Sequence, residues 1–150
     1  MKLRHVLLAA AVAVIAVGFL ATCDLFTSPV SIDQRIADFQ SDLNNAVRTS
    51  AYNDFHPTMT ADYNALKDGT TINTLFPVVN GGTTYTLTVT DESSPSTGVM
   101  VTVSGGPNTF NSGSPKYLKL VMAVTGTADY RIVSLEMETS AVFPGPAQIQ

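Results

Sequence analysis

The spacing of apolar residues changes once along this chain, from every third or fourth residue to every second. Five apolar residues recur at helical spacing in the first part: Ile32, Ile36, Phe39, Leu43 and Val47. This stripe predicts an amphipathic helix of about four turns. Ser31 and Gln34 form a capping-box pair at its start. We expect Arg35 and the acidic residues near it to lie on the solvated side.

Shorter helical segments follow this helix. Ser50 is placed to cap a turn. Pro57 and Thr58 are placed to start a second helix, and Gly69 is placed to end it in a left-handed conformation. One further helical turn is expected over residues 71–76. These segments therefore form a helical region that precedes the strands.

From residue 83 onward, apolar and polar residues alternate, which predicts β-strands. Four segments are assigned as strands: 83–90, 99–104, 117–124 and 130–138. The third is apolar on both faces after Lys119, so we expect it in the centre of a sheet. In the fourth, strict alternation places Leu135 on one face and Ile132 on the other.

Helices followed by strands indicate an α+β domain, with the helices packed on one face of a four-stranded antiparallel meander. We assign this domain to residues 31–140. Residues 141–150 are expected to be a frayed, flexible tail, because Phe143-Pro144-Gly145-Pro146 cannot continue regular structure. The order of elements resembles the cone fold of the nuclear transport factor two and ketosteroid isomerase superfamily. A cystatin-like sheet wrapped on one helix is the neighbouring alternative.

The only long apolar run extends from Val6 to Ala21, after a basic start that contains Lys2 and Arg4. The run is shorter than the roughly 17–25 residues of a helix that spans a bilayer. It ends at small residues, as a secretory signal peptide does. We therefore predict a signal peptide over residues 1–22.

The end of this segment, Leu20-Ala21-Thr22-Cys23, resembles the lipobox of bacterial lipoproteins, although Thr22 stands where glycine, alanine or serine is usual. The resemblance implies cleavage before Cys23 and acylation of its thiol with palmitate-type chains. Residues 23–30 would then tether the domain to a membrane of the bacterial cell envelope, on the exported side. Two alternatives stay open: an ordinary signal peptide cut near Ala21, and an uncleaved membrane anchor.

Composition limits the partners and the stabilising chemistry. The chain has 8 lysine and arginine residues and 12 aspartate and glutamate residues. Loss of Lys2 and Arg4 with the signal leaves 6 basic and 12 acidic side chains, a net charge of about −6. This charge disfavours binding to nucleic acid. Cys23 is the only cysteine, so no disulfide forms within the chain.

Candidate catalytic chemistry is sparse. Asp54 and His56 form an acid–histidine pair at a junction between helical segments, where a carboxylate and an imidazole can move protons. The alternative is that Asp54 caps the next turn and His56 is a surface residue. Glu136 and Glu138 lie on one face of the last strand. Paired carboxylates work as acid and base when burial raises one pKa, but edge strands also contain charges that prevent aggregation.

Metal and cofactor sites are not expected. Zinc sites need clustered histidine and cysteine, and Asp91-Glu92 is a short acidic turn rather than a calcium loop. The aromatic residues either belong to the core or line an apolar cavity, and we favour the core: Tyr52, Phe55, Tyr63, Phe76, Tyr85 and Tyr117.

Three functions remain open, and the absence of a catalytic constellation favours the first. It is a non-enzymatic binding or structural module of the envelope, whose partner is an envelope protein. The second is a binder of a small apolar ligand, with a pocket between the first helix and the sheet. The third is an isomerase-like enzyme that uses Asp54 or His56. A filled interior would favour the first function, and a cavity with buried polar groups one of the others.

Overall fold

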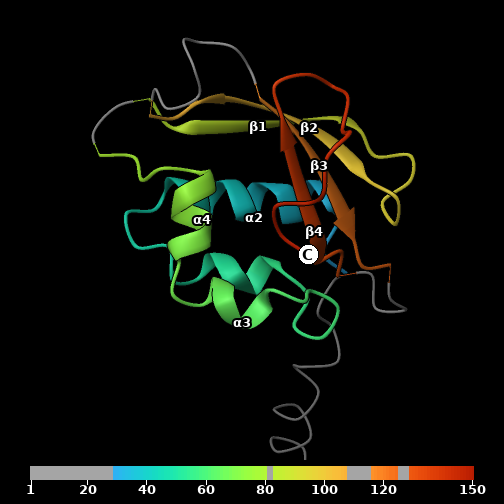
Figure 1. Ribbon diagram of the computed structural model, residues 1–150, viewed down its shortest axis with the longest axis horizontal. Helices are drawn as coiled ribbons and strands as arrows, with labels where there is room; N and C mark the ends of the chain where they lie inside the picture. Colours follow the sequence, from blue (N-terminus) through green and yellow to red (C-terminus); the bar gives the residue numbers. More distant parts are fainter. Residues whose placement is uncertain (1–28, 81–82, 108–115, 125–128) are drawn as a thin grey trace, which may run out of the picture.

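Helical segments precede a four-stranded sheet in the computed structural model, which describes residues 29–80, 83–107, 116–124 and 129–150 (Figure 1). The helical segments are α2 (Ile32–Asn44), η2 (Ala51–Asp54), α3 (Tyr63–Leu66) and α4 (Thr70–Leu75). The strands are β1 (Tyr85–Asp91), β2 (Val99–Gly105), β3 (Lys116–Met122) and β4 (Ile132–Glu138). The predicted signal peptide, with Cys23, lies outside the described residues.

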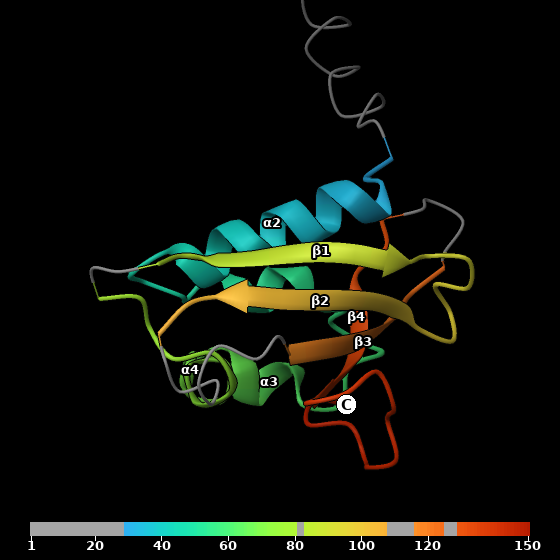
Figure 2. The same ribbon diagram turned by 90° about the horizontal axis from the view of Figure 1, so that it is seen from above.

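The sheet is an antiparallel meander with the order β1-β2-β3-β4. The helices lie on one face of it, so the predicted α+β class is confirmed (Figure 1). Helix α2 runs alongside β1 in the opposite direction, and α3 and α4 lie at the other side of the same face (Figure 2). Strand β3 is central, as its apolar character predicts.

The alternating pattern predicts the buried face of the first two strands. Tyr85 and Leu87 of β1 are buried, whereas Thr86 and Thr88, which alternate with them, are exposed. The valines of β2 are buried in the same way, and they are Val99, Val101 and Val103. Period-two alternation therefore places these side chains correctly.

Strand β4 departs from strict alternation. Met122 pairs with Ile132 and Val121 pairs with Ser134, so the register shifts by one residue at Val133. Such a β-bulge turns the residues before it to the other face of the sheet. Both Ile132 and Leu135 are consequently buried, and the prediction that they face opposite sides is wrong.

Helix α2 begins where the sequence predicts. Ser31 is the N-cap, and its hydroxyl accepts a hydrogen bond from the Gln34 amide at 3.1 Å. The Gln34 side chain does not complete the capping box but donates to Asp38 at 2.7 Å. The helix ends at Asn44, so Val47 lies beyond it and is 64% exposed rather than part of the buried stripe.

The second helix is shorter than predicted. Residues 57–59 form a turn, and helical structure begins only at Tyr63. Gly69 ends the segment with φ of +76°, the left-handed conformation that the sequence predicts. Proline at position 57 therefore marks the start of a turn instead of a helix.

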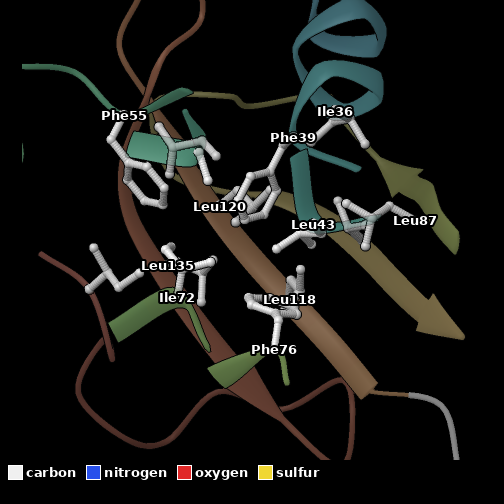
Figure 3. Close-up of a cluster of buried hydrophobic side chains, with 14 of the residues drawn as sticks. Ile36, Phe39, Leu43, Phe55, Ile72, Phe76, Leu87, Leu118, Leu120 and Leu135 are labelled. Atoms are coloured by element: carbon white, nitrogen blue, oxygen red, sulfur yellow. The ribbon is translucent and has the colours of Figure 1, made fainter. Parts of the chain in front are cut away.

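Aromatic side chains fill the space between α2 and the sheet (Figure 3). The Phe39 ring makes edge-on contacts with Phe55 and Phe76, with ring centroids 5.9 and 5.8 Å apart. Phe76 makes a third such contact with Tyr85 at 5.8 Å. Edge-to-face pairs of this kind stabilise a core beyond the burial of their area. These four aromatic residues thus belong to the core, whereas Tyr52 and Tyr63 are only partly buried.

The end of the chain returns to the sheet. Ile149 is fully buried and pairs with Leu135, whose amide donates to the Ile149 carbonyl at 2.9 Å. The Asp62 amide donates to the Gln150 carbonyl at 2.6 Å. The prediction of a frayed tail over residues 141–150 is therefore wrong for its last residues. The buried side chain of Ile149 and these backbone hydrogen bonds together dock the end of the chain.

Arg48 makes buried contacts that no local sequence pattern predicts. Its side chain is 3% exposed, and it donates to the carbonyls of Leu43, Phe76 and Pro77. The guanidinium also lies over the Tyr85 ring, 5.6 Å from the centroid. The last carbonyls of a helix have no partner within the helix. Arg48 supplies donors to such groups at the ends of both α2 and α4.

Candidate functional site

The predicted lipidation site, Cys23, lies outside the described residues, so its acylation stays a prediction. The same holds for the signal peptide and for most of the tether. Within the described part of the chain, no helix is both long and apolar enough to cross a bilayer. The remaining candidate sites lie in the domain.

Asp54 is buried at the end of η2 and pairs with Arg35 of α2. The Arg35 Nη1 group donates to Asp54 Oδ1 at 2.9 Å, and both side chains are less than 10% exposed. Arg35 also donates to the Asp129 carbonyl through Nε and Nη2, at 3.3 and 3.1 Å. The expectation that Arg35 is solvated is therefore wrong. A buried carboxylate from another element keeps the guanidinium out of water.

The pKa of Asp54 is raised from 3.8 to about 7. Burial is the largest cause, because it disfavours the charged carboxylate. The hydrogen bond and charge of Arg35 act in the opposite direction and lower the pKa. A raised pKa of this kind occurs at catalytic sites and at structural ion pairs alike. The contacts around Asp54 therefore decide between a catalytic site and a structural ion pair.

The structure does not assemble the predicted acid–histidine pair. His56 Nδ1 faces the next turn, where it accepts from the Met59 amide at 3.2 Å. Among the described residues, no hydrogen bond or ion pair joins His56 to Asp54. Asp54 does not cap the following turn either, because its other oxygen, Oδ2, is buried and accepts no hydrogen bond within the described residues. The ion pair between Arg35 and Asp54 is thus a structural connection between α2 and η2.

The two glutamates of β4 are also not a carboxylate pair. Glu136 pairs with Lys119 of β3, with Nζ and Oε1 3.0 Å apart. Glu138 lies opposite Tyr117 in the neighbouring strand. Both lie on the face of the sheet that points away from the helices. A cross-strand ion pair such as Lys119–Glu136 stabilises a sheet modestly.

The space between α2 and the sheet, where a pocket for a small apolar ligand would lie, is filled by side chains. Phe39 and Leu43 of α2 are completely buried, as are Leu118 and Leu120 of β3, which face them (Figure 3). Ile36 and Leu87 close the cluster toward β1. Protein interiors packed in this way have little room for a ligand. The observation favours the first of the three functions.

The seam between α2 and β1 contains three hydrogen bonds from helix side chains to the strand backbone. The Asn44 side chain accepts from the Tyr85 amide at 2.7 Å and donates to the Tyr85 carbonyl at 2.8 Å. One helical turn earlier, Gln40 Oε1 accepts from the Leu87 amide at 2.7 Å. Strand β1 is at the edge of the sheet. Two helix side chains therefore bind backbone groups that an edge strand otherwise presents to solvent.

The N-terminal half of the same seam is open. A hollow of about 340 Å³ lies there between the helix and the edge strand. Its lining comes from both elements, and the residues used below are Asp33, Ile36, Ala37, Gln40, Leu87 and Val89. A second hollow, of about 520 Å³, shares Asp33 and Val89 and continues along residues 90–93. We call these two adjoining hollows the α2–β1 groove.

The described residues contain no group of three or more histidine, cysteine, aspartate or glutamate side chains that could hold a metal ion. Comparison of the chain with protein-family models, curated protein sequences and solved structures finds no match in any of the three.

Proposed function

We propose that this protein is a membrane-anchored lipoprotein of a bacterial cell envelope, and that its domain is a non-enzymatic binding or structural module. The filled interior between α2 and the sheet supports the module best. A binder of small apolar ligands needs a cavity there, and the position is occupied by Phe39 and Leu43. The anchor rests on the lipobox-like residues around Cys23.

The enzyme alternative has less support. An acid or base has to reach the proton that it transfers. Asp54 is 3% exposed and bound to Arg35, and it lines neither hollow of the α2–β1 groove. His56 contributes its ring nitrogen to a local turn. These contacts favour structural roles for both residues.

Acyl labelling tests the anchor. Cells that express the full chain are grown with an alkyne-tagged palmitate, and membranes are separated from soluble protein. The wild-type protein should be labelled and should sediment with membranes, because two or more acyl chains anchor stably. Cys23→Ala should abolish both labelling and sedimentation. Thr22→Gly, which restores a usual lipobox residue, is the matched control and should be labelled at least as well as wild type.

Unchanged labelling and unchanged membrane partition of Cys23→Ala would contradict the lipoprotein assignment. A wild-type protein that sediments with membranes but is not labelled would instead support an uncleaved apolar anchor. Release of an unlabelled wild-type protein in soluble form would support an ordinary signal peptide.

A further inference from the structure

The hydrogen bonds along the α2–β1 seam follow a register. Four residues of a helix advance about 6 Å, and two residues of a strand advance about 6.8 Å. Asn44 therefore meets Tyr85, and Gln40 meets Leu87, as the hydrogen bonds show. Continued by one more turn, the register brings Ile36 and Ala37 to Val89. Neither of these side chains has a polar atom that could bind the strand.

The backbone of Val89 faces the groove. In an antiparallel sheet, alternate residues direct their amide and carbonyl to the same side of the strand. The amides of Tyr85 and Leu87 point to α2 rather than to β2. Val89 pairs with Val101 in the same register in which Tyr85 and Leu87 pair with β2, so its amide and carbonyl point the same way. The register shifts between Val89 and Asp91, so the regular edge of β1 ends at Val89. Residues Ile36 and Ala37, which line the groove opposite, leave these groups available to an added strand.

One end of the groove is acidic. Asp33 belongs to both hollows, and Asp91 and Glu92 line the second. All three side chains are exposed, and none forms an ion pair within the described ranges. Asp91 accepts a hydrogen bond from the Ser93 amide at 2.9 Å, which fixes its carboxylate beside the turn. The charge at this end favours a cationic side chain on whatever enters the groove.

We propose that the α2–β1 groove binds an extended peptide segment of a partner protein by strand addition to β1, with a lysine or arginine of that segment at the acidic end. Main-chain hydrogen bonds to Val89 would provide affinity, and alternate side chains would lie against Ile36 and Ala37. The proposal rests on the proposed function as a binding module and names its site.

A second copy of this chain fits the groove less well than a separate peptide. Helix α2 lies beside the edge of β1 (Figure 2). A β1 edge from another copy would bring its own helix against this one. It would also add a second set of carboxylates to Asp33, Asp91 and Glu92, and like charges placed together are unfavourable. A single extended segment avoids both problems.

The test uses the full chain in detergent micelles and a fluorescent ten-residue peptide that alternates valine and threonine and ends in two lysines. Fluorescence anisotropy should show saturable binding. Ala37→Trp, which fills the groove, should weaken binding about tenfold or more. N-methylation of alternate peptide amides should weaken it similarly, because the methyl groups remove the main-chain donors. Thermal melting of Ala37→Trp checks that the domain stays folded.

Charge provides a matched comparison. Glu92→Lys should weaken binding several-fold more than Asp68→Lys, because both change the net charge equally but Asp68 lies outside the groove, just before α4. Hydrogen exchange of the Val89 amide should slow when the peptide is bound. These readouts are local to the groove and do not depend on acylation.

No saturable binding to wild type would overturn the proposal, as would equal loss of binding in Glu92→Lys and Asp68→Lys. A dimer that Ala37→Trp dissociates, without peptide binding, would overturn the peptide in favour of a second copy. Peptide binding by a protein that is not acylated would support the groove and contradict only the anchor. Acylation without peptide binding would contradict only the groove.

Discussion

Helix α2 contacts strand β1 differently along its two halves. In the C-terminal half, Asn44 and Gln40 bind the backbone of the edge strand through three hydrogen bonds of 2.7–2.8 Å. In the N-terminal half, Ile36 and Ala37 occupy the corresponding positions, and a hollow lies between the two elements. We call these the closed half and the open half of the seam.

At the open half of the seam, helix α2 is held in place by contacts with elements other than β1. Arg35 binds the Asp54 carboxylate and the Asp129 carbonyl, so it connects the start of α2 to η2 and to the segment before β4. The helix thus needs no contact with the β1 backbone at this end. An edge strand can therefore stay accessible over part of its length while the helix that covers the rest remains packed against it.

The largest expected effect concerns the core on which both halves rest. Phe39→Ala removes a fully buried ring that contacts Phe55 and Phe76, and should lower the free energy of unfolding by about 3–5 kcal/mol. Chemical denaturation measures the change. Val47→Ala is the control, because it belongs to the same apolar stripe in sequence but is 64% exposed. Its effect should stay within about 0.5 kcal/mol, and equal losses in the two variants would contradict the packing.

The next effect is on the pH dependence of stability, and it tests the Arg35–Asp54 pair that holds α2 at the open half. The pKa of Asp54 is about 7 in the folded protein against an ordinary value of 3.8. Between these values the native state holds a proton that the unfolded state has lost. The unfolding free energy should therefore fall as the pH rises from 5 to 7, by about 1 kcal/mol per pH unit at the lower end. Denaturant midpoints at several pH values measure this slope.

Asp54→Asn removes the titrating group while keeping the shape and one oxygen acceptor for Arg35. Its stability should consequently vary less over the same pH range than that of wild type. A wild-type stability that is constant or rises from pH 5 to 7 would contradict the raised pKa. An Asp54→Asn profile with the wild-type slope would assign the titration to another group.

The regular elements could be predicted because they follow local patterns. The stripe at Ile36, Phe39 and Leu43 and the alternation in β1 and β2 each depend on residues that are neighbours in sequence. The buried face of β4 could not be predicted in this way, because the bulge at Val133 adds one residue and interrupts the alternation. Local patterns also gave no reason for Ile149 to return to Leu135 after a proline-rich turn.

The candidate site could not be predicted in the same way, because it arises from contacts between distant residues. The acidic turn at Asp91 and Glu92 is visible in the sequence, but nothing in it indicates that Asp33 lines the same hollow. Arg35 is a charged residue at the border of the apolar stripe, and only the fold brings Asp54 to it. Tertiary contacts therefore decide which polar residues belong to a site and which to the structure.

The substitution with the smallest expected effect is one that would open the closed half of the seam. Asn44→Ala removes both side-chain bonds to Tyr85 and leaves a partly buried amide and carbonyl without them. The loss should lower the free energy of unfolding by about 1–2 kcal/mol, and exchange of the Tyr85 amide should become faster. The neighbouring Asn45→Ala is the control, because Asn45 is exposed and its side chain accepts only a local amide, that of Val47, at 3.3 Å. If Tyr85 exchange is unchanged in Asn44→Ala, the side chain does not close the edge, and the contrast between the two halves fails. If exchange accelerates at Tyr85 but not at Val89, closure is local to each pair in the register, as the open half requires.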